Sequence, residues 1–241
     1  MDEIFIVCLY VDDLIYTGNS VGLIEEFKSC MINEFEMTDL GLMSYFLGLE
    51  VKQRDGIFIS QEKYVNDWLE KFNMKECNPV KTPKNTNKKN FSLNNGEEKI
   101  DAWVYRSLIG SLLYLTSSRP DFMHATCLLS RFMQSPSKVY YGAAKRVLRY
   151  LKGTSSYHIW YNNVGDFQLR GFSDSDWASS IDDRRSTTGY TFNLGSGAIS
   201  WCSKKQSSTT LSSTEAEYMA ATSAACQAVW LRRVLEDMKQ H

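Results

Sequence analysis

The sequence lacks the segments that mark membrane-spanning and secreted proteins. Its 241 residues contain no apolar run of roughly 18 or more. A basic region followed by a small-residue cleavage site is also absent from the amino terminus. These absences argue against a membrane span and a secretory signal. We therefore expect an intracellular protein, in the cytoplasm or nucleus, that is not secreted and has no membrane partner.

Paired cysteines and catalytic histidine motifs are missing as well. The six cysteines have spacings that fit neither a zinc site nor a disulfide framework, so we expect reduced and mostly buried thiols. The three histidines share no motif with a serine or cysteine nucleophile, which leaves a hydrolytic triad without support. Structural roles are their default. These residues are Cys8, Cys30, Cys77, Cys127, Cys202, Cys226, His124, His158 and His241.

An excess of basic residues is also missing, because the formal net charge is −1. This balance excludes a uniformly basic nucleic-acid binder but leaves room for local patches. Four basic residues recur at spacings that place them on one face of a helix, opposite an apolar face. A charged helix face is usually its solvated side, and contact with nucleic-acid phosphates is the alternative. The four are Lys138, Lys145, Arg149 and Lys152.

Two adjacent carboxylates, Asp12 and Asp13, stand between apolar runs at residues 4–11 and 14–16. The uninterrupted runs predict two buried strands joined by a tight turn at the aspartates. Side-by-side negative charges at a hydrophobic hairpin cost free energy unless cations neutralise them or one takes up a proton. A divalent metal site resolves this cost. A solvated turn is the alternative, although two-residue hairpins prefer Asn-Gly or Asp-Gly.

The elements that follow the hairpin can be assigned from residue patterns. Ser20 can cap a helix, residues 45–51 and 56–60 form a second predicted hairpin, and another helix begins near residue 61. Residues 78–98 are rich in Lys, Asn and Pro and poor in apolar side chains, which predicts a weakly ordered linker. Three helical stretches are then expected, near 103–116, 119–133 and 137–152.

A second pair of carboxylates is expected towards the end of the chain. Asp174 ends the first of three predicted strands, and Glu217 lies in the first turns of a helix over 213–239 that should pack on them. Glu215 follows Ser212 at a capping-box spacing, so its expected role is to cap this helix. The strands are expected at 167–173, 189–194 and 198–204, the helix should face them with Tyr218, Ala221, Ala225, Val229 and Leu235, and Trp177, Trp201 and Trp230 are assigned to the core.

Several of these segments resemble one family. Residues 10–14, Tyr-Val-Asp-Asp-Leu, resemble the palm motif of reverse transcriptases, and residues 46–51 with 56–59 resemble the primer-grip hairpin that follows it. Three further blocks are similar to the ribonuclease H region of copia-type LTR retrotransposon Pol polyproteins, and all blocks occur in the expected order over nearly the full chain. The three blocks are residues 182–190, 199–206 and 211–218.

This resemblance implies an α+β protein in which a reverse-transcriptase palm end and helical connection precede a truncated ribonuclease H-like α/β domain. It implies that Asp12 and Asp13 are catalytic metal ligands of the polymerase, and that Asp174 and Glu217 are those of the nuclease. Weakly held Mg2+ or Mn2+ and a template-primer or RNA/DNA hybrid are the implied cofactor and partner. The implied domains are 1–77 for the palm end, 78–98 for the linker, 99–156 for the thumb or connection helices and 157–241 for the partial ribonuclease H domain.

The resemblance also implies that both metal sites are incomplete. A reverse transcriptase needs a further aspartate from a strand before the hairpin, and ribonuclease H needs aspartates that follow the long helix. Several carboxylates are needed to fix two cations around a scissile phosphate. We therefore expect a polyprotein fragment that is inactive without the missing segments of the polyprotein. A non-catalytic nucleic-acid-binding module and a non-functional remnant are the alternatives.

Overall fold

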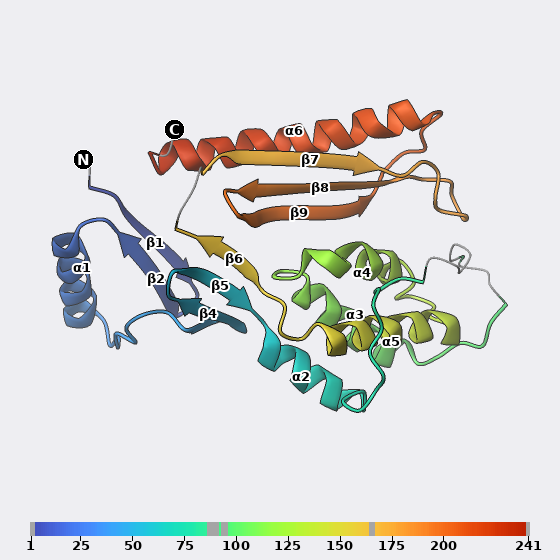
Figure 1. The fold of residues 1–241 in the computed structure, drawn as a ribbon, viewed down its shortest axis with the longest axis horizontal. Helices are drawn as coiled ribbons and strands as arrows, with labels where there is room; N and C mark the ends of the chain where they lie inside the picture. The colour runs from blue at the N-terminus through green and yellow to red at the C-terminus, as the bar shows by residue number, and fades with distance from the viewer. Residues whose placement is uncertain (1–2, 86–91, 93–95, 164–166, 240–241) are drawn as a thin grey trace.

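The computed structural model describes residues 3–85, 92, 96–163 and 167–239, so His241 and part of the predicted linker lie outside the described residues. Figure 1 shows a group of helices beside three antiparallel sheets, an arrangement that confirms the predicted α+β class. The sheets have the strand orders β1-β2, β3-β4-β5-β6 and β7-β8-β9. In the described ranges, no helix is long and apolar enough to cross a bilayer.

The first hairpin is formed by β1 (Phe5–Tyr10) and β2 (Asp13–Gly18), and helix α1 (Val21–Glu34) covers one of its faces. The Phe27 ring of α1 lies 5.0 Å from the ring of Phe5, measured between centroids. The expectation of buried strands is wrong for β1, because Leu9 is 69% exposed and its neighbours are exposed as well. The apolar runs supply two hydrophobic faces, and the described chain covers only one of them.

The second sheet contains the predicted second hairpin and one strand from much later in the chain. Phe58 pairs with Trp160 across β5 and β6, and their ring centroids lie 3.8 Å apart. Residues 159–162, which lie within the predicted ribonuclease H domain (157–241), pair with β5 of the second sheet. The strands are β3 (Tyr45–Phe46), β4 (Leu49–Gln53), β5 (Gly56–Ser60) and β6 (Ile159–Asn162).

A helical bundle forms the main hydrophobic core, and the predicted helices are confirmed there. Tyr105, Tyr140 and Leu148 are among its most buried side chains, each with at most 1% exposed. The residues opposite the basic face of α5 are buried, as its amphipathic pattern predicts. The bundle contains α2 (Glu62–Lys71), α3 (Ala102–Leu115), the 3-10 turn η1 (Pro120–Phe122), α4 (Met123–Ser130) and α5 (Lys138–Gly153).

A buried ionic network joins the start of η1 to the end of α5. Arg119 is 4% exposed, and its guanidinium lies 2.8 Å from the Asp121 carboxylate while it donates to the carbonyl and hydroxyl of Thr154. The Tyr150 hydroxyl donates to the same carboxylate at 2.7 Å. Burial alone would raise the pKa of Asp121, but the hydrogen bonds from Arg119 and Tyr150 hold it below its usual value.

The third sheet carries α6 (Ser213–Asp237) along β7 and β8, as Figure 1 shows. The predicted strand, strand, strand, helix order is confirmed, but the inward face of α6 is not the expected one. Tyr218 is 73% exposed, whereas Ala216 and Ala220 are fully buried, because the sheet accepts a stripe of small residues one position away. The strands are β7 (Leu169–Ser175), β8 (Thr187–Leu194) and β9 (Gly197–Lys205).

Three smaller expectations are corrected by the structure. The cysteines are free, as predicted, but none is buried. Trp177 and Trp230 are 53% and 57% exposed rather than in the core, and Trp201 is half-buried. Ser20 stands at the N-cap of α1 without a side-chain cap hydrogen bond, because its hydroxyl donates to Glu3 instead.

The first part of the predicted linker is ordered. The Val80 amide donates to the carbonyl of Arg149, and the Arg149 Nε donates to the carbonyl of Asn78 at 2.6 Å. A hydroxyl of Thr82 accepts from the Arg146 guanidinium at 2.9 Å. Residues 78–82 therefore dock on α5 through polar contacts, which explains how a segment poor in apolar residues can be held in place.

We predict that Asp121→Asn lowers the free energy of unfolding by about 2 kcal/mol at pH 7, because it leaves the buried Arg119 without its counter-charge. Urea unfolding measures this difference, with the exposed Asp237→Asn as the matched control. Because the folded pKa of Asp121 lies below its unfolded value, its stabilisation is complete above about pH 4 and is lost as the pH falls through the folded value. The difference in free energy of unfolding between wild type and Asp121→Asn should become smaller as the pH falls. A difference that does not change with pH would show that the Asp121 carboxylate does not stabilise the fold.

Candidate metal and nucleic-acid sites

The first pair of carboxylates lies at the tip of the β1–β2 hairpin. Tyr10 pairs with Asp13, so the two turn residues are Val11 and Asp12 rather than the two aspartates. Val11 has φ 52°, in the left-handed region that a β-branched residue rarely occupies. Both aspartates are exposed, and within the described ranges neither carboxylate has a hydrogen bond or an ion pair. They are open to solvent and chemically available to a cation.

The second pair is brought together from residues 43 positions apart. Glu217 Oε1 accepts a hydrogen bond from the Ser175 amide at 3.3 Å, which places the helix carboxylate at the end of β7, beside Asp174. Both acidic residues are exposed. The expected capping role of Glu215 is confirmed, because its amide donates to Ser212 Oγ and its carboxylate accepts from the amide of Leu211 at 2.6 Å.

The carboxylate oxygens at both places are ligands that suit Mg2+ or Mn2+. Each place offers two acidic residues, and nowhere in residues 3–239 that the structure describes do three or more His, Cys, Asp or Glu side chains gather around a potential metal position. Asp176 does not supply the third, because its carboxylate is occupied by its own loop. It accepts from the amide of Thr187 at 2.7 Å and from the hydroxyl of Ser179 at 2.6 Å. Carboxylate oxygens are suitable ligands for a divalent cation. Because each place offers only two acidic residues, a cation would be bound weakly there.

The four basic residues predicted on one helix face differ in what they contact. Lys138 forms an ion pair with Glu98 at 2.6 Å, and Arg149 holds the chain at Asn78. The Lys145 ammonium lies 4.7 Å from the centre of the Tyr141 ring. Lys152 has no contact of this kind in the described part of the chain. Lys138 and Arg149 therefore have structural partners, while Lys145 and Lys152 are available to other ligands.

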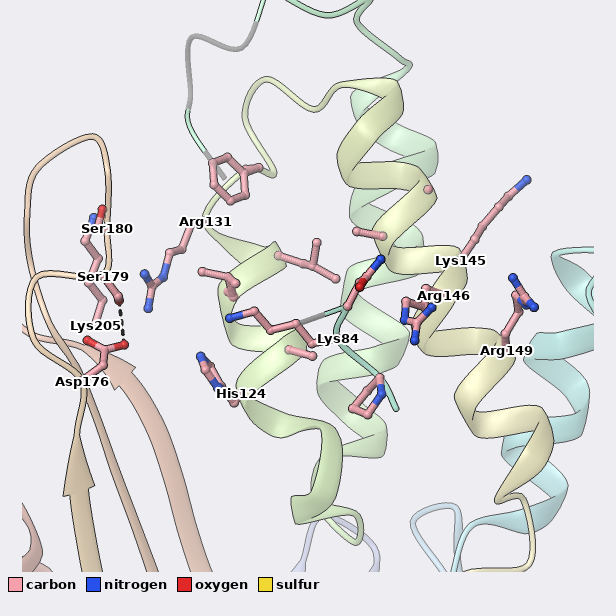
Figure 2. Close-up of a pocket in the computed structure, with 18 of the residues that line it drawn as sticks. Lys84, His124, Arg131, Lys145, Arg146, Arg149, Asp176, Ser179, Ser180 and Lys205 are labelled. Carbon is pink, nitrogen blue, oxygen red and sulfur yellow. Dashed lines mark hydrogen bonds between the residues drawn. The ribbon is translucent and has the colours of Figure 1, made fainter. Parts of the chain in front are cut away.

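A cavity of about 510 Å³ lies between α4, α5 and the loop that follows β7. Lys84, His124, Arg131 and Arg146 line it together with Lys145 and Arg149. Figure 2 shows Lys84 and Arg146 in the middle of the lining, His124 and Arg131 towards Asp176, and Lys145 and Arg149 on the opposite side. Burial at the cavity wall lowers the pKa of His124, and the Lys84 cation lowers it further.

Sequence reasoning missed this cavity. Lys84 lies in the segment interpreted as a linker, His124 was given a structural role, and Arg146 lies off the basic stripe of α5. The adjacent pair Lys145-Arg146 is the available signal, since it widens the basic face towards α4. The meeting of α4, α5 and residues 83–85 is a tertiary property that local spacing does not encode.

Comparison with known proteins identifies the class of the first part of the chain. A family model described as reverse transcriptase (RNA-dependent DNA polymerase) matches residues 1–86, the part that carries both N-terminal hairpins. The chain is 40% identical over its whole length to the Pol polyprotein of transposon TNT 1-94 from Nicotiana tabacum, covering 19% of that polyprotein. It is 38% identical over 98% of its length to the Pol polyprotein of transposon RE2 from Arabidopsis thaliana, covering 16% of it.

The chain therefore belongs to the Pol polyprotein family of copia-type retrotransposons. It spans between 16% and 19% of the length of the polyproteins that it matches. It also resembles an uncharacterized mitochondrial protein of Arabidopsis thaliana, with 38% identity over 92% of each chain. No solved structure matches the chain.

The hairpin geometry yields a stability prediction. Val11→Gly should raise the free energy of unfolding by about 0.5 to 1 kcal/mol, because relief of the positive-φ strain outweighs the entropy cost of glycine. Chemical unfolding followed by tryptophan fluorescence measures the change. Val7→Gly, inside β1, is the control and should lower stability, so a loss of stability in both variants would show that the turn is not strained.

Proposed function

We propose that this chain is the part of a retrotransposon Pol polyprotein that carries the polymerase aspartates Asp12 and Asp13 together with half of a ribonuclease H-type site, Asp174 and Glu217. The observation that carries the nuclease half is the Glu217 hydrogen bond to the Ser175 amide at 3.3 Å. This contact ties the helix carboxylate to the residue that follows Asp174 in the chain, which supports the pairing of the two acids. The reverse-transcriptase family match over residues 1–86 supports the polymerase half.

Asp174 and Glu217 would hold a divalent cation through their carboxylate oxygens at the end of β7. A bound Mg2+ or Mn2+ supplies charge neutralisation at a scissile phosphate and a more acidic bound water. The protein contributes position: the Ser175 amide orients Glu217, and the capping contacts of Glu215 fix the first turn of α6. Asp12 and Asp13 would hold a cation in the same way at the hairpin tip.

We expect the chain to be inactive by itself. Two carboxylates at each place are fewer than a two-metal site needs, and the described residues contain no larger group. Further ligands would have to come from other segments of the polyprotein. In isolation the chain acts as a nucleic-acid-binding unit, with Lys145 and Lys152 on the exposed face of α5 as its contacts to an RNA/DNA hybrid.

We predict measurable but weak binding of Mn2+ at Asp174 and Glu217. Electron paramagnetic resonance of free Mn2+ should detect millimolar affinity for the wild-type chain, since only two carboxylates contribute. In a chain that already carries Asp12→Asn and Asp13→Asn, so that the hairpin tip does not contribute, Asp174→Asn with Glu217→Gln should remove the remaining Mn2+ binding without changing the thermal melting curve. Glu215→Gln is a matched control that changes a carboxylate of the same helix turn. If Asp174→Asn with Glu217→Gln leaves Mn2+ binding in that chain unchanged, the pair is not the metal position.

A labelled RNA/DNA hybrid tests the function as a whole. The chain should bind the hybrid with an affinity that falls steeply as salt rises, and Lys145→Gln with Lys152→Gln should weaken binding by roughly tenfold at low salt. The control is Lys63→Gln with Lys71→Gln on α2. Cleavage in Mg2+ or Mn2+ that disappears in Asp174→Asn would contradict inactivity, and the absence of any binding would favour a non-functional remnant.

A further inference from the structure

The cavity between α4 and α5 is lined by more cations than carboxylates. In the parts of the chain that the structure describes, none of Lys84, Arg131 and Arg146 forms an ion pair. The Arg131 guanidinium donates to the Thr187 hydroxyl at 2.9 Å, which is a neutral partner. Bringing several cations together at one half-enclosed cavity is unfavourable unless an anion compensates them.

One buried donor in this lining has no hydrogen-bond partner among the residues that the structure describes. The Nε of Arg146 is shielded from solvent, and no acceptor lies within hydrogen-bond distance of it among the described residues. Its Nη2 donates to the hydroxyl of Thr82, which fixes the direction of the guanidinium. An unsatisfied charged donor costs more than a neutral one, so the Arg146 guanidinium is poorly compensated within the fold itself.

Two acidic residues, Asp176 and Asp182, also line the cavity, and they are fewer than its cations. Asp176 is held by the Thr187 amide and the Ser179 hydroxyl, the second of which is drawn as a dashed line in Figure 2. Asp182 accepts a hydrogen bond from the hydroxyl of Ser92 at 2.6 Å. Lys205 is the one lining cation with a close carboxylate in the described chain, that of Asp183 at 2.6 Å. The remaining lining is positively charged.

Part of the cavity wall is apolar, with Leu128, Leu129 and Pro83 beside the cationic groups. A volume of about 510 Å³ is in the range of small-molecule sites. A ligand that suits this lining has an anionic head and an apolar body. A phosphate monoester carries close to two negative charges at neutral pH and offers three terminal oxygens, which matches cations that approach from several sides.

We propose that this cavity binds the phosphate monoester of a nucleotide, with the phosphate between Arg131, Arg146 and Lys84 and the base against the apolar wall. The monoester can come from a free nucleotide or from the 5′ end of a nucleic acid. This proposal does not rest on the metal positions or on binding of a hybrid, since its residues are different and its ligand needs no cation.

Calorimetry in EDTA at pH 7 tests the proposal with adenosine 5′-monophosphate, adenosine and an oligonucleotide with or without a 5′ phosphate. At least one phosphorylated probe should bind at least tenfold more tightly than its unphosphorylated counterpart. Arg146→Gln and Arg131→Gln, on different helices, should each weaken that binding by about tenfold. Arg233→Gln, exposed on α6, is the matched control, and thermal melts establish that each variant folds.

The pattern of binding identifies the source of the phosphate. Binding of the mononucleotide assigns the cavity to free nucleotides, whereas a preference confined to the phosphorylated oligonucleotide assigns it to nucleic-acid ends. The proposal is overturned if neither phosphorylated probe binds up to about 10 mM, if removal of the phosphate changes nothing, or if both arginine variants bind like Arg233→Gln.

Discussion

The buried contact between Arg119 and Asp121 is the constraint on which the arrangement of the chain depends. It ties the start of η1 to Thr154, the residue at which α5 ends, and Tyr150 closes the network from within α5. A charge with 4% exposure is tolerated only because every side of the guanidinium meets an acceptor or an aromatic ring. The end of α5 is thereby fixed, and with it the point from which β6 leaves towards the second sheet.

The position of the end of α5 affects the strand that follows it and the contacts of the helix itself. β6 pairs with β5, and the Tyr161 hydroxyl donates to the carbonyl of Ala198, so one short strand contacts the second and third sheets. The body of α5 is held in turn at the angle that lets Arg146 face α4. The helices that form the cavity are packed in the hydrophobic core of the bundle, and these polar contacts add to that packing at the end of α5 and at β6.

The positions of helices and strands could be predicted from the sequence more accurately than the contacts between them. Periodicity located the helices, the hairpins and the juxtaposition of Glu217 with the end of β7, because each depends on residues within one element and its neighbour. Periodicity did not predict features that depend on segments far apart in the sequence. These are the exposed face of β1, the small-residue stripe of α6 and the pairing of β6 with β5. The cavity belongs to this second group, since Lys84, Arg131 and Arg146 converge only in the folded chain.

The end of β7 and the loop after it contribute one aspartate to the proposed metal position and another to the lining of the cationic cavity. Asp174 and Asp176 are two residues apart, yet the first is exposed beside Glu217, and the second lines the cavity with both of its oxygens engaged. The satisfied hydrogen bonds of Asp176 keep an anion close to the cationic lining without an ion pair to Arg131. The two aspartates therefore differ in availability, because Asp174 is exposed to solvent whereas the carboxylate of Asp176 is engaged by groups of the protein itself.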